Sequence, residues 1–238
     1  MRNRLIIIFV LLLLVLVSFY AGYQFKGNSS PKKSLKVVGE VPGYTLTNQL
    51  GDKVSSNKFS GKVRVVSFLF PYCKEYCPLI AINMVNLEQI LKSAHLTNKV
   101  QLVSYDVDPE HTGPSQMRAF MKEYGWNPQN TDWQYLTGKP SQIKKIVRKS
   151  YYISYQQVSE ATEDSLINLE KKQGTYAPSP EVSNKLADKV NPDYDIAHND
   201  ALAIVDTKGR IRKIYDDADH VSNQRLLHVI DQLLPNKN

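Results

Sequence analysis

Apolar residues along the chain occur alternately in short extended runs and in longer stretches with helical spacing. Residues 63–70 are apolar at most positions, and such continuous burial favours a central strand that is covered on both faces. After Pro78, which suits the first turn of a helix, leucine and isoleucine recur at helical spacing as far as Leu91. The elements predicted beyond this helix are a strand at 100–105, a helix at 115–124, a strand at 133–136 and a helix at 141–149.

Hairpins are predicted on both sides of this alternating region. Short extended runs flank residues 48–52, and two later runs at 201–205 and 211–215 are separated by a turn that contains Gly209. A last helix is predicted at 221–234 because its apolar residues gather on one side. Parallel βαβ units followed by an antiparallel hairpin and a helix predict an α/β protein with a thioredoxin-like fold.

The first residues of the chain form an apolar segment with a basic leading edge. Residues 5–23 carry no charge and follow Arg2 and Arg4, and a stretch of about 19 residues can just span a bilayer. We therefore expect a signal-anchor transmembrane segment at 1–24, with a cleaved signal peptide as the alternative. The rest of the chain is then expected outside the cytoplasm at the cell membrane.

A polar, basic linker is expected at 25–40, and the remaining residues, 41–238, are enough for one well-buried domain. The regular pattern breaks down at about 154–192, where the sequence is polar and mixed in charge. We interpret this stretch as an insertion that lies over the core of the domain.

The charge balance first suggests a nucleic-acid partner, because the formal net charge is +7 and the pI is near 9.2. Six of the 30 basic residues, however, precede the first acidic residue, Glu40, and the rest of the chain is nearly neutral. The early basic residues are better explained by membrane topology than by a phosphate-binding surface. We expect no nucleic-acid partner.

The only two cysteines, Cys73 and Cys77, lie four positions apart where the central strand is predicted to turn into a helix. The unpaired N–H groups at a helix start stabilise anionic sulfur, so we expect a thiolate to be more accessible here. A disulfide across three intervening residues closes so small a loop that it would stabilise the fold little. The pair is therefore predicted to be reactive or metal-binding, with a structural disulfide as the alternative.

Several motifs occur in an order that resembles the SCO/SenC family. The resemblance covers residues 41–234, and the combination of Cys-x-x-x-Cys-Pro with a distal histidine is its most specific part. The motifs are Gly61-Lys62, Cys73-x-x-x-Cys77-Pro78, Asp106-Val-Asp-Pro-Glu110, Trp133-Gln-Tyr-Leu-Thr-Gly138, His198 and Asp206-Thr-Lys-Gly209. Members of this family are membrane-anchored thioredoxin-fold proteins that bind copper and help to assemble the binuclear copper centre of cytochrome c oxidase.

The resemblance implies a copper site made by Cys73, Cys77 and His198. Two thiolates and one imidazole form a soft, three-ligand set that suits Cu(I), with Cu(II) as a further form to be tested. The implied partner is the copper-bearing subunit of cytochrome c oxidase or another extracytoplasmic copper protein. Ala197 replaces the aspartate that commonly precedes this histidine in the family, so a different group is expected to orient the imidazole.

Other side chains near these motifs have simpler interpretations. The carboxylates of Asp106, Asp108 and Glu110 are expected as a polar rim of the site rather than as ligands. Solvated or packed roles suffice for the remaining histidines, which are His95, His111, His220 and His228.

A thiol-disulfide oxidoreductase with Cys73 and Cys77 as its redox pair is the main alternative function, and whether the protein is an enzyme stays open. Thioredoxin-like oxidoreductases normally carry Cys-x-x-Cys and a proline before the late hairpin, and residues 195–200 contain no proline. A peroxiredoxin is excluded because Phe70 and Lys74 occupy the positions of its required proline and threonine. The only support for a non-catalytic binding module is the number of tyrosines, 14, and this support is weak because tyrosine is common in half-buried strands and loops.

Overall fold

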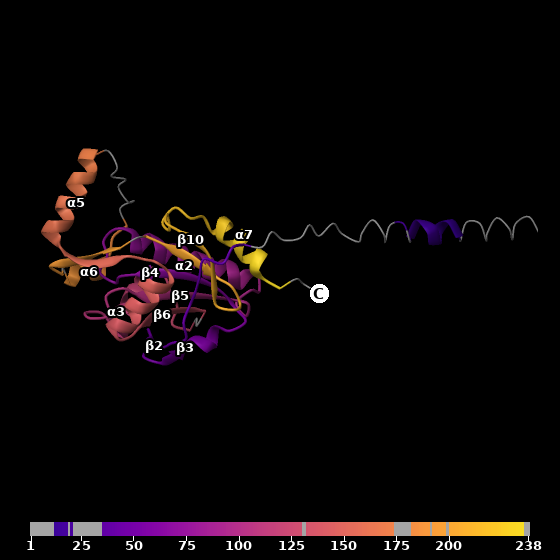
Figure 1. Cartoon of the computed structure of the whole chain (residues 1–238), viewed down its shortest axis with the longest axis horizontal. Coiled ribbons are helices and arrows are strands. Elements are labelled where there is room, and N and C mark those ends of the chain that lie inside the picture. Colours follow the sequence, from indigo (N-terminus) through magenta and orange to yellow (C-terminus); the bar gives the residue numbers. More distant parts are fainter. Residues whose placement is uncertain are drawn as a thin grey trace, which may run out of the picture. The chain divides into compact units, whose positions relative to one another are not determined.

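The computed structural model describes residues 12–18, 20, 35–129, 132–173, 182–190, 192–198 and 200–235 (Figure 1). The chain divides into two compact units, Met1–Ser34 and Leu35–Asn238. The second unit begins before residue 41, and its first strand, at Gly39–Glu40, pairs with a strand of the late hairpin.

The second unit is built on an eight-stranded sheet of order β1-β10-β9-β4-β5-β6-β2-β3 (Figure 1). Its central strand β4 runs parallel to β5, and β5 runs parallel to β6. Every residue of β4 and β5 is buried, which confirms the predicted central strand. The strands are β1 (Gly39–Glu40), β2 (Thr45–Asn48), β3 (Lys53–Ser55), β4 (Val63–Leu69), β5 (Val100–Asp106), β6 (Trp133–Thr137), β9 (Leu202–Val205) and β10 (Arg210–Tyr215).

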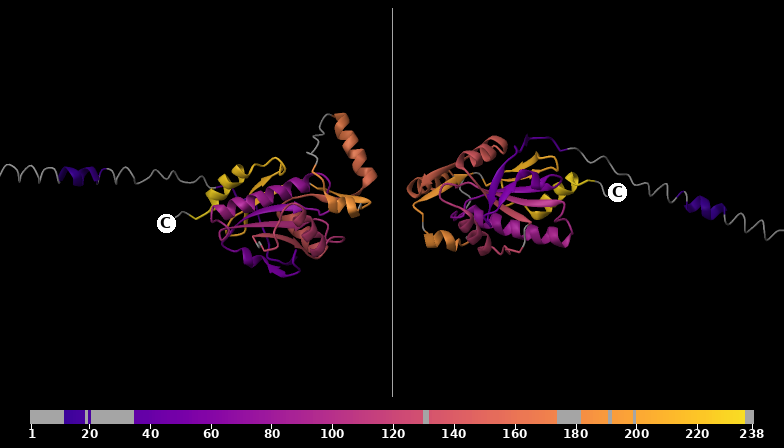
Figure 2. Two further views of the ribbon diagram at one scale, coloured as in Figure 1. Left: turned by 180° about the vertical axis from the view of Figure 1, so that it is seen from behind. Right: turned by 90° about the horizontal axis from the view of Figure 1, so that it is seen from below.

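Helices follow the parallel strands, as the alternating pattern predicts. Helix α2 packs against the C-terminal helix α7, and Figure 2 shows the two side by side. A π-helical turn, Lys145–Ser150, continues α4, and a short 3-10 helix, Ser56–Phe59, follows β3. The α-helices of this region are α2 (Tyr76–Ser93), α3 (Pro114–Glu123), α4 (Pro140–Lys144) and α7 (Asn223–Leu233).

Both predicted hairpins are present. Strands β2 and β3 pair in an antiparallel manner around residues 49–52, and β9 pairs with β10 through the Asp206–Gly209 turn. Gly209 adopts a φ of 86°, a left-handed conformation that glycine takes without steric cost. The β9 strand also pairs with β4, so the late hairpin extends the sheet beside the central strand.

The stretch expected as an insertion contains ordered elements of its own. Strands β7 (Tyr155–Ser159) and β8 (Tyr194–His198) form a separate antiparallel two-stranded sheet. Helix α5 (Glu160–Gln173) contacts both strands, and helix α6 (Lys185–Val190) contacts α3. Strand β8, which follows the predicted insertion and ends at His198, therefore belongs to a second sheet.

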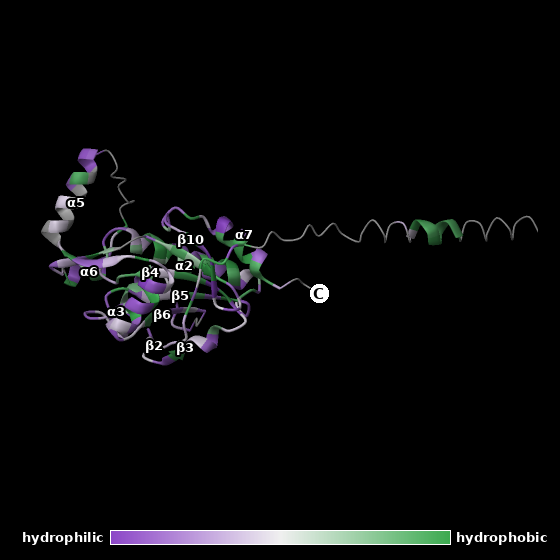
Figure 3. Ribbon diagram, in the orientation of Figure 1, coloured by the Kyte–Doolittle hydropathy of each residue, from purple (hydrophilic) through white to green (hydrophobic). Residues whose placement is uncertain are grey.

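The transmembrane helix expected at 1–24 is not found among the residues that the structure describes. The described residues 12–18 are helical, apolar (Figure 3) and exposed. Within the part of the chain that the structure describes, no helix is long and apolar enough to cross a membrane. The prediction is corrected accordingly; apart from Tyr20, the other residues of the 1–24 segment lie outside the described part.

Candidate metal centre

The two cysteines lie together at the end of the central strand. Cys73 is in the loop between β4 and α2, and Cys77 is in the first turn of α2. Both side chains are thiols in this structure; Cys73 is 5% exposed and Cys77 is fully buried. The Phe70 N–H donates to the Cys77 Sγ at 3.4 Å, and the side chain of Cys73 is hydrogen-bonded to that of Cys77. The structure thus brings two of the three expected ligands together.

The environment of Cys77 differs from the sequence-based expectation. Burial raises the pKa of the Cys77 thiol well above its ordinary value, and the adjacent Cys73 raises it further. The hydrogen bond from the Phe70 N–H acts in the opposite direction but does not compensate. The prediction of an accessible thiolate is therefore wrong for Cys77, because its side chain is buried away from water and burial disfavours the charged form. A positive ion held by both sulfurs would favour their deprotonation.

A buried asparagine from the insertion supports the cysteine loop. The Asn184 side-chain amide donates to the backbone carbonyls of Pro71 at 2.9 Å and of Cys73 at 2.7 Å. Its side-chain oxygen accepts from the Ala187 N–H at 3.0 Å, which caps helix α6. Sequence reasoning missed this residue, because an asparagine before a short helix indicates a cap and says nothing about a loop 111 positions away.

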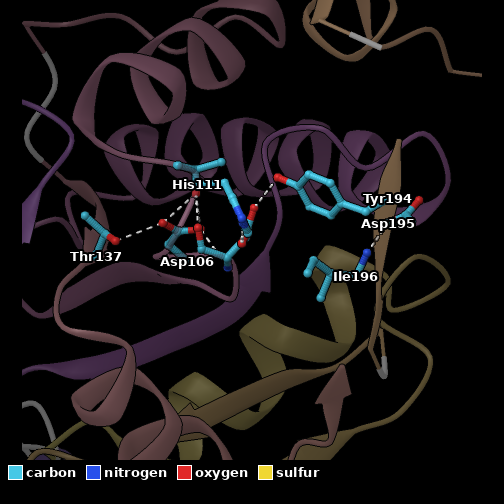
Figure 4. A network of polar contacts seen from close by, with 8 residues as sticks. Asp106, His111, Thr137, Tyr194, Asp195 and Ile196 are labelled. Carbon is cyan, nitrogen blue, oxygen red and sulfur yellow. Dashed lines mark hydrogen bonds and ion pairs between the residues drawn. The ribbon is translucent and has the colours of Figure 1, made fainter. Parts of the chain in front are cut away.

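Strand β8 is connected to the body of the domain through Asp108; Figure 4 labels Tyr194 of β8 and His111, the two residues that contact this carboxylate. The Tyr194 hydroxyl donates to Asp108 Oδ2 at 2.7 Å, and His111 Nδ1 lies 2.8 Å from Asp108 Oδ1. The Tyr194 ring also lies 5.9 Å from that of Phe70, centroid to centroid. Because Phe70 contacts Cys77, these interactions place β8 beside the thiols.

His198 is the last residue of β8 and pairs with Tyr155 of β7. Its side chain lies outside the described residues. Asp195, on the same strand, lies close enough to Cys77 to raise the pKa of that thiol further. Among the described side chains, no group of three or more His, Cys, Asp or Glu residues could hold a metal ion. The complete three-ligand site therefore stays a prediction.

Two of the carboxylates expected as a polar rim are instead buried structural groups. Asp108 forms the contacts described above. The carboxylate of the fully buried Asp106 lies 2.8 Å from the hydroxyl of Thr112 and 2.8 Å from that of Thr137, and Figure 4 shows the contact with Thr137. Burial raises the pKa of Asp106 to about 7, although the threonine hydroxyls lower it. Of the three carboxylates Asp106, Asp108 and Glu110, only Glu110 is exposed.

This raised pKa predicts a pH dependence of stability. Between its ordinary pKa of 3.8 and about 7, the Asp106 carboxyl binds a proton in the folded protein that it does not hold in the unfolded chain. The free energy of unfolding should therefore fall as the pH rises from about 4 to about 7. We expect Asp106→Asn to remove this contribution in urea titrations across that pH range. Identical pH dependence in the wild type and the variant would contradict this result.

Comparison with protein-family models and with curated proteins points to one family. The family model described as SCO1/SenC matches residues 36–176. A SCO1 protein homolog from Bacillus subtilis (strain 168) is 34% identical over 113 residues, which are 47% of this chain and 56% of the relative. The chain spans about half the length of the curated relatives it matches.

Solved structures share the fold of the domain. BsSco, a member of the Sco family of cytochrome c oxidase assembly proteins in which a disulfide switch was identified, aligns with a TM-score of 0.59 at 22% identity. The alignment covers 86% of this chain and 100% of BsSco. Bradyrhizobium japonicum ScoI with copper bound aligns with a TM-score of 0.56 at 21% identity, covering 82% of this chain and 99% of ScoI. The predicted thioredoxin-like α/β fold is confirmed.

Proposed function

The chain belongs to the SCO1/SenC family, and on that premise we propose that it is a copper-binding assembly protein. Its recipient is the copper-bearing subunit of cytochrome c oxidase or another extracytoplasmic copper protein. The protein delivers copper to this partner or prepares the partner's thiols. The observation that carries the proposal is the pair of adjacent, mutually hydrogen-bonded thiols of Cys73 and Cys77 at the end of the central strand.

The proposed ligands are Cys73, Cys77 and His198. Two sulfurs and one imidazole nitrogen suit Cu(I), and a three-coordinate ion leaves room for a ligand from the recipient. Binding exchanges the thiol protons for the metal ion, so the protein gives up protons as copper enters. The copper-bound structure of the Bradyrhizobium japonicum relative supports the proposal.

The proposed place of action is the extracytoplasmic side of the cell membrane. The basic residues Arg2 and Arg4 ahead of an apolar run support export of the domain. Cell fractionation combined with protease treatment of intact spheroplasts tests this proposal. Digestion of the domain in intact spheroplasts is expected, and protection until the cells are lysed would contradict it.

The test of copper delivery uses the purified full chain, loaded with Cu(I), and the separately purified copper-bearing domain of the oxidase subunit without metal. After anaerobic mixing, we expect copper to be recovered with the recipient in proportion to the loaded chain. If copper stays on the chain while a disulfide in the recipient is reduced, the alternative function of a dithiol oxidoreductase is supported instead.

The anchoring of β8 by Asp108 makes a specific prediction about copper affinity. Tyr194→Phe removes the hydroxyl that donates to Asp108 and loosens the strand that ends at His198. We expect Cu(I) affinity to fall about tenfold, as is typical when a group that supports a ligand is lost. Competition with a Cu(I) chelator measures the change, and Tyr152→Phe, at a tyrosine that is 65% exposed, is the matched control. Equal affinity in the two variants would remove the proposed role of this contact.

A further inference from the structure

A polar pocket lies at the far end of strand β4 from the cysteines. It has a volume of about 210 Å³, and its lining includes Arg64, Ser56, Thr207 and Lys208. Arg64 is the second residue of β4, whereas Cys73 follows the end of that strand. Five residues of extended strand separate Arg64 from Leu69 by about 17 Å, so this pocket is separate from the candidate metal centre.

Arg64 is a buried cation without a matching anion. The residue is 5% exposed, and its Nε is buried with no hydrogen-bond partner. The guanidinium is hydrogen-bonded to the Tyr44 hydroxyl, a neutral group. Among the described residues, no carboxylate forms an ion pair with Arg64. Because burial of an unpaired charge is unfavourable, an anion bound in the pocket would be stabilised by the Arg64 guanidinium.

The nearby carboxylate of Asp206 already forms ion pairs with two other arginines. Asp206 accepts hydrogen bonds from the side chains of Arg210 at 2.8 Å and Arg212 at 2.7 Å. Burial alone would raise the pKa of Asp206, but these two arginines lower it below its ordinary value. Asp206 Oδ1 also accepts from the Lys208 N–H, which shapes the turn at the pocket. The Asp206 carboxylate thus orders the turn and leaves the Arg64 charge unneutralised.

The remaining lining offers donors from several directions. Ser56 Oγ accepts from the Tyr44 N–H at 3.1 Å, which leaves its own proton available to donate. Lys208 is exposed and adds a second positive charge. A Cβ atom at Gly209 would lie 3.2 Å from Arg64 Nη2, so the glycine leaves space for the guanidinium at the pocket wall. Hydroxyl, ammonium and guanidinium donors around one small space suit a tetrahedral oxygen anion.

We propose that the Arg64 pocket binds a phosphate group, either inorganic phosphate or the phosphoryl group of a small monoester. The bound dianion accepts hydrogen bonds from Arg64, Ser56 and Thr207 and pairs with Lys208. It neutralises the buried guanidinium and connects the β9–β10 turn with the segment after β3. This site is independent of copper and of the two thiols.

Calorimetric titration of the full chain with inorganic phosphate at constant ionic strength tests the proposal, with chloride as the background anion. We expect saturable binding of one phosphate, a loss of binding in Arg64→Gln and a weakening of about tenfold in Lys208→Gln. Lys92→Gln, at an exposed lysine in the last turn of α2, is the matched control and should bind as the wild type does. A parallel titration with glycerol phosphate distinguishes a monoester from free phosphate.

Absence of saturable binding in the wild type would overturn the proposal, and so would equal binding of acetate and phosphate. Arg64→Gln alters a buried position and could fail to fold, so amide chemical shifts of the wild type give a second readout. On addition of phosphate, the largest shifts are expected at residues 56–60 and 207–209. Shifts that spread evenly over surface lysines would identify only non-specific ion binding and would contradict the assignment.

Discussion

Replacement of Cys77 by serine should abolish tight Cu(I) binding. A hydroxyl oxygen is a poor ligand for a soft ion, and even the loss of groups that only support a ligand costs about 10- to 100-fold in metal affinity. We therefore expect Cys77→Ser to weaken Cu(I) binding by more than about 100-fold in anaerobic competition with a chelator. Cys73→Ser should have the same effect, because the two thiols lie together in one hydrogen-bonded pair.

Correct folding of the serine variants can be verified separately. The Phe70 N–H that donates to the Cys77 Sγ can donate equally well to a serine hydroxyl, so the helix start should be preserved. Ser93→Ala, at the end of the same helix, serves as the control and should bind copper as the wild type does. Wild-type affinity in a folded Cys77→Ser variant would exclude this sulfur as a ligand.

The second large effect is expected at Asn184. Asn184→Ala removes the donors to the buried carbonyls of Pro71 and Cys73, and it also removes the cap of α6. Each buried acceptor without a partner costs about 1–3 kcal/mol, so the loss of both donors should lower the free energy of unfolding by about 2–6 kcal/mol. Urea denaturation of the reduced full chain measures this change.

The same variant should also bind copper less tightly, because the loop that carries Cys73 loses its connection to the insertion. Asn98→Ala, at an exposed asparagine, is the matched control and should change stability by no more than about 0.5 kcal/mol. If the two variants are equally stable, the insertion does not hold the cysteine loop, and the hydrogen bonds of Asn184 contribute nothing measurable.

Local pattern was sufficient to predict the main sheet and its helices. The mostly apolar run of β4 and the helical spacing in α2 each reflect burial along one element, and both appear directly in the sequence. The β9–β10 hairpin was predictable because a glycine turn separates two extended runs. The position of the two thiols followed from these elements.

Contacts between distant polar residues could not be predicted in this way. Asn184 and Cys73, or Tyr194 and Asp108, are joined only by the tertiary fold, and neither residue of either pair identifies the other in one sequence. The strands β7 and β8 have partly exposed, polar residues, so their pairing left no clear pattern. The pKa of Cys77 was also misjudged, because the helix terminus was considered without the burial that accompanies it.

The two candidate functions make different demands on His198. A copper chaperone needs the imidazole as a third ligand, whereas a dithiol oxidoreductase needs only Cys73 and Cys77. His198→Ala should therefore separate them, because it leaves both sulfurs and their hydrogen bond unchanged. The reduction potential of the cysteine pair in this variant should remain close to that of the wild type.

The most direct test of the copper assignment is an anaerobic Cu(I) titration of the reduced full chain against a competing chelator, with the wild type and His198→Ala side by side. We predict one tight equivalent in the wild type and an affinity at least about tenfold lower in the variant. Equal Cu(I) affinity in the two proteins would contradict the three-ligand site and would favour the dithiol oxidoreductase.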